Sequence, residues 1–201
     1  MLAGFNANCL SFNAHMRIIG GAHRGRKLRT LAGSETRPTS DRLRETLFNI
    51  LASRINASRF LDVCAGSGAV GIEALSRGAR EATFIDHSRA ACAVIKTNLN
   101  SLGFEKSAVV LCRNASAALT SLELDSKQFD IVFFDPPYAS EIYSEVMPQL
   151  GLGKLISNGG IVVLEHRVKV PMEAAYAKLH LYRELKQGES ALAFYEFLCA
   201  D

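Results

Sequence analysis

The sequence of 201 residues lacks the features of membrane and secreted proteins. No apolar stretch approaches the roughly 20 residues that a helix needs to cross a bilayer. Residues 1–15 have neither the basic start nor the sustained apolar centre of a secretory signal. We therefore expect a cytoplasmic protein that has no membrane partner.

Cysteine and histidine are scarce and scattered. The five cysteines are widely spaced without a Cys-x-x-Cys pair, and the five histidines complete no zinc-ligand pattern. An odd number of dispersed cysteines indicates reduced thiols, most of them in the core. We predict no bound metal.

Internal repeats, low-complexity tracts and long linkers are also missing. The chain is 48% apolar with a mean hydropathy of +0.09, which is enough to bury one substantial core. We expect a single domain with a short appendage.

Basic residues gather near the start of the chain. From Arg17 to Arg59 there are ten Lys or Arg and three acidic residues, a net charge of +7 within a total of +3. The remainder is therefore mildly acidic, at −4. Gly20, Gly21 and Gly25 suggest a tight two-stranded ribbon that presents these cations together. This favours contact with nucleic-acid phosphates over an ordinary solvated surface.

Apolar periodicity predicts alternating strands and helices. Ser40 is a candidate N-cap for an amphipathic helix that carries Leu43, Leu47 and Ile50. Strands are then expected at 60–63, 82–85, 108–111, 131–134 and 160–164, and helices at 69–76, 89–102, 115–122 and 141–150. Segments 179–186 and 191–198 suggest a closing antiparallel hairpin. Repeated strand–helix units predict a parallel α/β sheet with helices on both faces.

A glycine-rich turn follows the first of these strands. Asp62 precedes Gly66, Gly68 and Gly71, so the backbone can turn tightly and approach a ligand beside a helix N-terminus. About twenty residues later the next strand ends at Asp86, which is placed to accept from ribose hydroxyls. The spacing indicates a nucleotide-like cofactor. It also matches the NAD fingerprint, but no hydride-transfer site is recognisable further along the chain.

The sequence Asp135-Pro136-Pro137-Tyr138 directly follows the apolar run 131–134. The acid therefore emerges at the carboxyl end of a buried strand, where open α/β sheets bind their ligands. Two consecutive prolines stiffen the turn and keep the carbonyls of Asp135 and Pro136 out of the sheet ladder.

These groups suit methylation of an exocyclic amine on a nucleobase. The lone pair of such an amine is delocalised into the ring, and acceptors on its two N–H bonds make it available for attack. Asp135 and the Pro136 carbonyl are two such acceptors, and Tyr138 offers a flat face for stacking worth roughly 1 to 3 kcal/mol. The alternative is an ordinary Pro-Pro turn with an incidental acid.

The motifs together resemble a bacterial family, the 16S ribosomal RNA guanine-N2 methyltransferases that modify guanine 966. The resemblance covers residues 17 to about 197, and its specific part is N-terminal. The stretches that carry it are 17–21, 24–28, 37–39, 42–49, 62–75 and 135–138.

The resemblance implies a Rossmann-like class I methyltransferase with a seven-stranded, mostly parallel sheet and an N-terminal β-hairpin. It implies S-adenosylmethionine as cofactor and 16S rRNA in the small ribosomal subunit as partner. We expect a monomer. We expect a tail without counterpart at 1–15, a basic hairpin arm at 16–39 and a methyltransferase domain at 40–201.

Site residues are carried over by position. Residues 66–68 would pass under the methionine part of the cofactor, Asp86 would hold the ribose, and Asn114 would meet the adenine edge. The full cofactor set is Asp62, Ala65, Gly66, Ser67, Gly68, Asp86, His87, Asn114, Ala115, Arg37, Thr39 and Phe48. The catalytic set is Asp135, Pro136, Pro137 and Tyr138, and the RNA-binding set is Arg17, Arg24, Arg26, Lys27 and Arg29.

Several alternatives stay open. Asn114 could simply cap the next helix, and Phe48 could be a core residue. Relatives commonly carry Glu at the position of Asp86. The aspartate side chain is shorter, so it reaches less far toward the ribose. A DNA adenine-N6 methyltransferase shares the catalytic turn, although little chain remains for its usual target-recognition domain. A noncatalytic RNA-binding assembly factor is a further alternative, against which the intact glycine turn argues.

Overall fold

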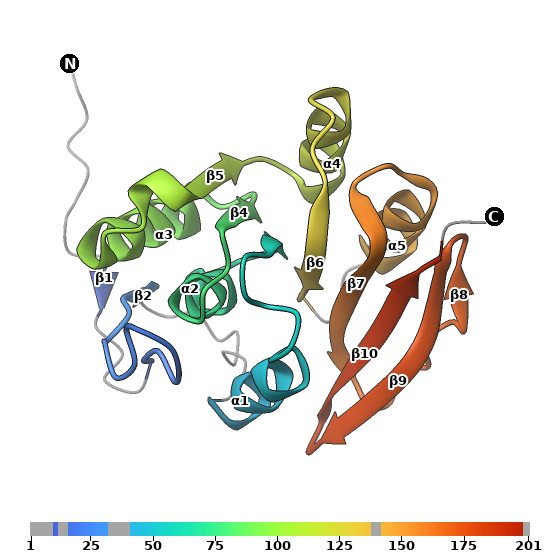
Figure 1. Ribbon diagram of the computed structural model, residues 1–201, viewed down its shortest axis with the longest axis horizontal. Helices are drawn as coiled ribbons and strands as arrows, with labels where there is room; N and C mark the ends of the chain where they lie inside the picture. Colours follow the sequence, from blue (N-terminus) through green and yellow to red (C-terminus); the bar gives the residue numbers. More distant parts are fainter. Residues whose placement is uncertain (1–9, 12–15, 32–40, 138–141, 199–201) are drawn as a thin grey trace.

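An eight-stranded sheet forms the centre of the protein (Figure 1). The structure is a computed structural model, and it describes residues 10–11, 16–31, 41–137 and 142–198. From one edge to the other the strands are β5 (Ala108–Cys112), β4 (Glu81–Asp86), β3 (Arg59–Val63), β6 (Phe129–Phe134), β7 (Ile156–Arg167), β10 (Ser190–Phe197), β9 (Leu179–Gln187) and β8 (Ala175–Tyr176). Strands β5 to β7 in this order are parallel, and β10, β9 and β8 pair antiparallel.

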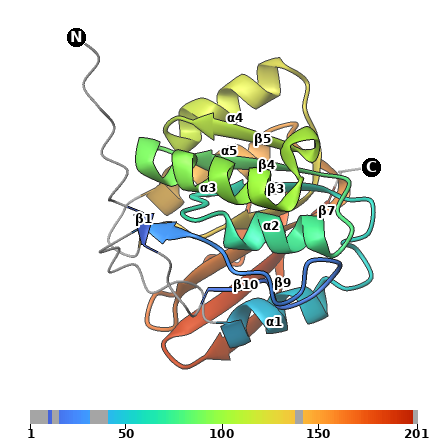
Figure 2. The same cartoon turned by 90° about the vertical axis from the view of Figure 1, so that its left-hand side faces the viewer.

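Helices cover both faces of the sheet. One face carries α1 (Asp41–Ile50), α2 (Ala69–Ser76) and α3 (Arg89–Leu102), which lie toward the viewer in Figure 2. The other carries α4 (Ala115–Leu124) and α5 (Ile142–Leu152). A short 3-10 turn, η2 (Glu105–Ser107), leads into β5. None of the described helices has the length and apolar character needed to traverse a bilayer.

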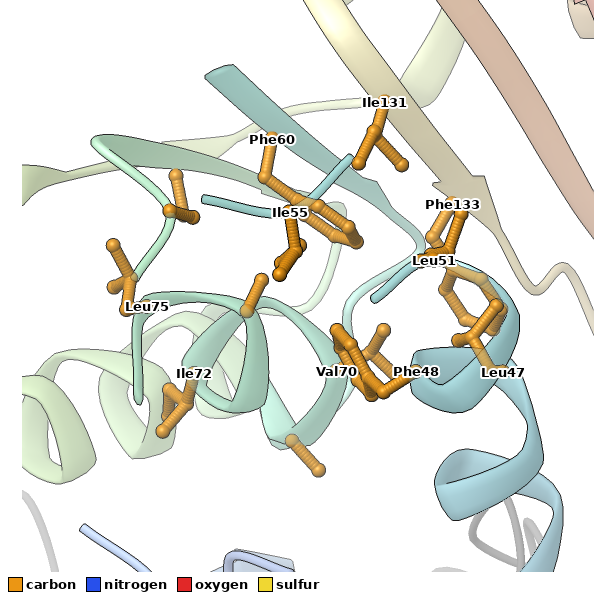
Figure 3. Packing of buried hydrophobic residues seen from close by; sticks show 14 of the residues in the cluster. Leu47, Phe48, Leu51, Ile55, Phe60, Val70, Ile72, Leu75, Ile131 and Phe133 are labelled. Carbon is orange, nitrogen blue, oxygen red and sulfur yellow. The ribbon is translucent and has the colours of Figure 1, made fainter. Parts of the chain in front are cut away.

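Alternation along the strands divides the core into two clusters. Ile131 and Phe133 point to the cluster under α1 and α2, whereas Val132 and Phe134 point to the cluster under α4 and α5. Figure 3 shows part of the first cluster, which contains Phe60 and Phe133 of the sheet, Leu47, Phe48 and Leu51 of the α1 region, and Val70, Ile72 and Leu75 of α2.

The expected α/β architecture is confirmed, with one difference in strand number. Seven strands were expected in the sheet, and the described part of the chain has eight. The additional strand is β8, whose two residues pair as Ala175 with His180 and Tyr176 with Leu179. Two residues are too short to show an alternating pattern, so the sequence gives no signal for this edge strand. The proposed cap at Ser40 lies outside the described residues.

Residues 16–28 form an antiparallel N-terminal hairpin, as the glycines suggested. Arg17 and Lys27 form a bridge, and the Ile18 amide donates to the Arg26 carbonyl at 3.0 Å. β1 (Leu10–Ser11) and β2 (Thr30–Leu31) pair beside it. Met16, Ile18 and Leu28 are buried in the core cluster of α1, α2 and α3. The hairpin is therefore packed onto the domain along α2 (Figure 2), and its four basic residues, Arg17, Arg24, Arg26 and Lys27, are exposed.

A buried carboxylate on α2 fixes this hairpin. Both oxygens of Glu73 accept backbone hydrogen bonds, from the Ile19 amide at 2.8 Å and the Gly20 amide at 2.7 Å. The Arg77 guanidinium donates to Glu73 at 2.9 Å, and the fully buried Arg44 of α1 lies 3.8 Å away. A single side chain thus joins the hairpin, α1 and α2.

Glu73→Ala should destabilise the fold. It leaves two backbone amides and two guanidinium groups without their carboxylate, and breaking a buried pair in this way costs about 3 to 5 kcal/mol. Urea unfolding measures the change, and Glu81→Ala, which removes an exposed acid of β4, is the matched control. A loss for Glu73→Ala no larger than that for Glu81→Ala would contradict this account.

Candidate functional site

The strand order reverses between β3 and β6. From β3 the chain proceeds outward through β4 and β5, and from β6 it proceeds the other way to β7. Open α/β sheets bind ligands at the carboxyl ends of strands at such a reversal, because the two flanking loops diverge there. Val63 is paired with Phe134, and the Asp135 amide donates to the Val63 carbonyl at 3.3 Å. The loops that follow β3 and β6 are therefore neighbours.

The glycine loop, residues 65–68, leaves β3 through a sharp turn. Cys64 at its start has φ +63°, and Gly66 and Gly68 have φ +57° and +77°. This left-handed region costs a residue with a side chain of the order of 1 kcal/mol or more, so Cys64 stores strain at the site. A Cβ on Gly66 would meet no atom of the described residues within 4 Å, so its backbone angle is what requires glycine.

The end of this loop starts α2 under tight packing. Gly68 is the N-cap, and no side chain of the described residues caps it, so main-chain N–H groups open the helix. A Cβ at Gly71 would stand 2.4 Å from the ring of Phe84 and 3.1 Å from Asp62, which only glycine avoids. The third glycine of the motif thus brings α2 close to the sheet.

Asp86 holds the glycine loop from the neighbouring strand. One oxygen accepts from the Gly66 amide and the other from the Ser88 amide, both at 2.8 Å. Ser88 in turn caps α3 by accepting from the Ala91 amide at 3.3 Å. His87 extends into solvent with 80% of its side chain exposed. Asp86 is therefore fixed between the loop and the start of α3.

Two further groups show how closely the carboxylates gather. Asp62 is buried and accepts from the Gly71 amide at 2.9 Å, and burial raises its pKa to about 7, with the charge of Asp86 adding to the shift. Burial also raises the pKa of Cys64 to about 12, and the charges of Asp86, Asp135 and Asp62 contribute. The acids whose charges act on this thiol come from three adjacent strands, β4, β3 and β6.

Other residues of the expected site vary in placement. Asn114 caps α4 by accepting from the Ser116 amide at 2.9 Å, and Ala115 is buried beneath it. Phe48 is fully buried, with its ring centroid 6.4 Å from that of Phe60, which matches its alternative assignment to the core. Arg37, Thr39 and Tyr138 lie outside the described residues.

The catalytic turn and the basic hairpin are each partly exposed. Asp135 is half-buried, Pro136 is buried and Pro137 is exposed. Arg17, Arg24, Arg26 and Lys27 are exposed, and Arg29 is half-buried.

Asn98 of α3 is a linking residue that the sequence did not reveal. It is buried, and its amide nitrogen donates to the carbonyls of Arg29 at 3.0 Å and Ser67 at 3.1 Å. Its oxygen accepts from the Arg29 amide at 2.8 Å. One side chain thereby connects the strand that follows the N-terminal hairpin to the glycine loop. The only sequence signal is a polar residue on the apolar face of α3, beside Val94 and Ile95.

Comparison with known proteins decides the family. The family model described as conserved hypothetical protein 95 matches residues 16–196. Ribosomal RNA small subunit methyltransferase D of Escherichia coli K12 is 37% identical over 186 residues, which cover 92% of each chain. The chain belongs to this family.

Solved structures agree with this assignment. A hypothetical protein of Thermus thermophilus matches with a TM-score of 0.78 at 32% identity, over 89% of this chain and 98% of that one. A SAM-dependent methyltransferase of Agrobacterium tumefaciens shares the fold alone, with a TM-score of 0.57 at 17% identity over 76% of this chain and 60% of that one. Across the described part of this family member, no three His, Cys, Asp or Glu side chains are grouped so as to hold a metal ion.

Asp62→Asn should change how stability depends on pH. Because burial raises the Asp62 pKa from 3.8 to about 7, the protonated side chain favours folding, and this contribution is lost as pH rises through 7. Asparagine keeps an acceptor for the Gly71 amide and carries no charge. When the pH is raised from 4 to 8, the free energy of unfolding of the variant should therefore increase relative to that of wild type by on the order of 3 kcal/mol. Urea unfolding at both pH values measures the difference, and Asp125→Asn, which changes an exposed acid in the same way, is the matched control.

Proposed function

We propose that this protein transfers a methyl group from S-adenosylmethionine to the exocyclic N2 amine of a guanine in 16S ribosomal RNA. The observation that carries the proposal is the adjacency of the glycine loop after β3 and the Asp135-Pro136 turn after β6. A cofactor loop and an amine-holding turn at one strand reversal suit group transfer between two ligands. The similarity to the Escherichia coli small-subunit rRNA methyltransferase supports the substrate class.

The residues around the glycine loop fit the cofactor. Gly66 leaves the face of the loop clear of described side chains, and the uncapped start of α2 offers N–H groups suited to a carboxylate. Asp86, at the end of β4, would accept from ribose hydroxyls, with Asn114 and Ala115 near the adenine. S-adenosylmethionine supplies a methyl group on a positively charged sulfur. We assign Asp62, Ala65, Ser67, Gly68 and His87 to the same pocket, and Arg37 and Thr39 to its N-terminal side. Phe48, which is fully buried against Phe60, belongs to the core and is not part of the pocket.

Asp135 and Pro136 would prepare the amine. The carboxylate and the carbonyl accept hydrogen bonds from the two N–H groups of the amine. This turns the nitrogen lone pair toward the cofactor, which the glycine loop after β3 would hold. Alignment of two reactants in this manner can remove roughly 7 to 11 kcal/mol of barrier. Asp135 also stands ready to accept the proton after the methyl group has arrived. Tyr138 would stack on the base, and Pro137 keeps the turn stiff.

The N-terminal hairpin would bind RNA phosphates. Met16, Ile18 and Leu28 are buried in the core cluster, whereas Arg17, Arg24, Arg26 and Lys27 are exposed. Arg29 follows at its base. We assign the basic arm at 16–39 to RNA binding through these cations, and residues 40–201 to the methyltransferase domain. Residues 1–15 precede the family match, and within them Leu10 and Ser11 pair with β2. We expect a monomer that acts in the cytoplasm without a metal.

Asp135→Ala should abolish methyl transfer and spare cofactor binding, because Asp135 contacts the amine. Transfer of a labelled methyl group to small ribosomal subunits measures the first effect, and calorimetry with S-adenosylmethionine measures the second. Asp125→Ala, which removes an exposed acid at the end of α4, is the matched control. Equal turnover by the Asp135→Ala variant and wild type would refute the role of Asp135. Methylation of duplex DNA in place of ribosomal subunits would favour the adenine alternative.

Mapping the modified base tests the substrate directly. Ribosomal RNA from cells that lack this protein should miss one N2-methylguanine of 16S rRNA, and the purified enzyme should restore it. An unchanged methylation pattern would contradict the proposal.

Replacing Arg24, Arg26 and Lys27 with Ala should weaken RNA binding and flatten its salt dependence. Each lost phosphate contact lowers the slope of log K against log salt by about 0.7 to 0.9. Filter binding between low and moderate salt measures the slope. The matched control replaces three exposed lysines elsewhere, Lys127, Lys154 and Lys169, which removes the same charge. Identical slopes for the two triple variants would contradict a specific role for the hairpin.

A further inference from the structure

A second acid lies beside Asp135 at the carboxyl edge of the sheet. Phe134 of β6 is paired with Leu164 of β7, so the next residues of the two strands, Asp135 and Glu165, are neighbours. β7 continues through Glu165 because it is also paired with β10, where Leu192 lies opposite. Glu165 is 2% exposed and stands on a regular strand, which fixes its backbone.

Strand alternation places both acids on one face. Phe133 and Val163 belong to the core cluster under α1 and α2, and Asp135 and Glu165 follow each of them by two residues. Leu192, opposite Glu165, belongs to the same cluster. The Asp135 amide still bonds to β3, so β6 keeps its direction up to this residue.

The neighbouring histidine belongs elsewhere. His166 lies on the opposite face of β7, fully buried, with its Nε2 atom 3.4 Å from Glu184 of β9. Glu165 therefore shares a face and an edge with the amine-holding turn, whereas His166 does not.

The proposed amine clamp does not by itself distinguish the two purines. The N6 amine of adenine and the N2 amine of guanine both present two N–H bonds, which Asp135 and the Pro136 carbonyl accept equally well. The atom beside the amine differs, because N1 of guanine carries a proton whereas N1 of adenine carries a lone pair. A carboxylate that faces N1 accepts from guanine and repels adenine.

We propose that Glu165 accepts the N1–H of the target guanine and so selects guanine as the methylated base. The inference rests on the proposed function, because it assumes that Asp135 and Pro136 hold the N2 amine. Placed next to Asp135 and on the same face, Glu165 is positioned to reach the edge of the base adjacent to that amine.

An analogue of the substrate tests this without any mutation. 2-Aminopurine keeps the N2 amine and has no N1 proton, and it is introduced at the mapped target position of 16S rRNA by ligation of a synthetic segment. If the site accepts the N1–H, kcat/KM for the RNA with 2-aminopurine should be at least about 100-fold lower than for the RNA with guanine. 6-Thioguanine keeps N1–H and changes only the O6 position, and it should remain a substrate. Equal methylation of guanine and 2-aminopurine would overturn the inference.

Glu165→Gln adds a test that a structural role would not pass. The amide can donate to the unprotonated N1 of 2-aminopurine, so the preference of kcat/KM for guanine should fall at least about tenfold. A purely structural defect would lower both rates and leave their ratio unchanged, which would count against the inference. Glu184→Gln, on the other face, is the matched control and should keep the wild-type ratio.

The two proposals fail in different ways. Wild-type protein that methylates no RNA guanine refutes the proposed function. Wild-type protein that methylates guanine and 2-aminopurine alike refutes only the role of Glu165. Thermal unfolding and calorimetry with S-adenosylmethionine establish that the Glu165→Gln protein is folded, and the wild-type comparison decides the question if it is not.

Discussion

The parallel pairing of β3 with β6 is the constraint on which the rest of the structure depends. It brings together two loops that are about seventy positions apart in the sequence, and it sets their relative height, since Val63 and Phe134 are partners. Parallel strands on either side of a reversal leave their C-terminal loops free to diverge. Every feature of the candidate site, from the strained Cys64 to the Asp135 turn, is arranged around that pair.

Buried polar groups then tie the basic hairpin to this centre. Glu73 binds the backbone of the hairpin from α2, while Asn98 joins Arg29 to Ser67 from α3. Buried hydrogen bonds of this kind specify a unique arrangement because leaving any partner unpaired is costly. The surface proposed to bind RNA and the loop proposed to bind the cofactor are consequently connected through one side chain, because Asn98 makes two hydrogen bonds to Arg29 and one to Ser67.

Sequence patterns captured the sheet, the five helices and the two main motifs, because apolar periodicity and glycine spacing are local signals. They also suggested the N-terminal hairpin. They did not reveal the contacts of Glu73 and Asn98, which join distant segments, or the position proposed for Glu165, which follows from the pairing of β6 with β7. Nor did they anticipate β8, which is too short to carry a pattern. Asn114 and Phe48 illustrate the remaining ambiguity, since a helix cap or a core aromatic looks the same in sequence as a ligand contact.

The contact between Gly71 and Phe84 limits how this scaffold can diversify. A Cβ at Gly71 would stand 2.4 Å from the ring of Phe84, so no larger residue fits between α2 and the sheet. The side of the candidate site that is formed by the glycine loop and α2 therefore tolerates little change. The other side of the site is formed by the Asp135-Pro136-Pro137 turn, the end of β7 and the β9–β10 hairpin that pairs with β7. New substrate specificities on this fold would therefore arise from changes at the turn after β6 and the end of β7, while the cofactor-binding loop and α2 stay the same.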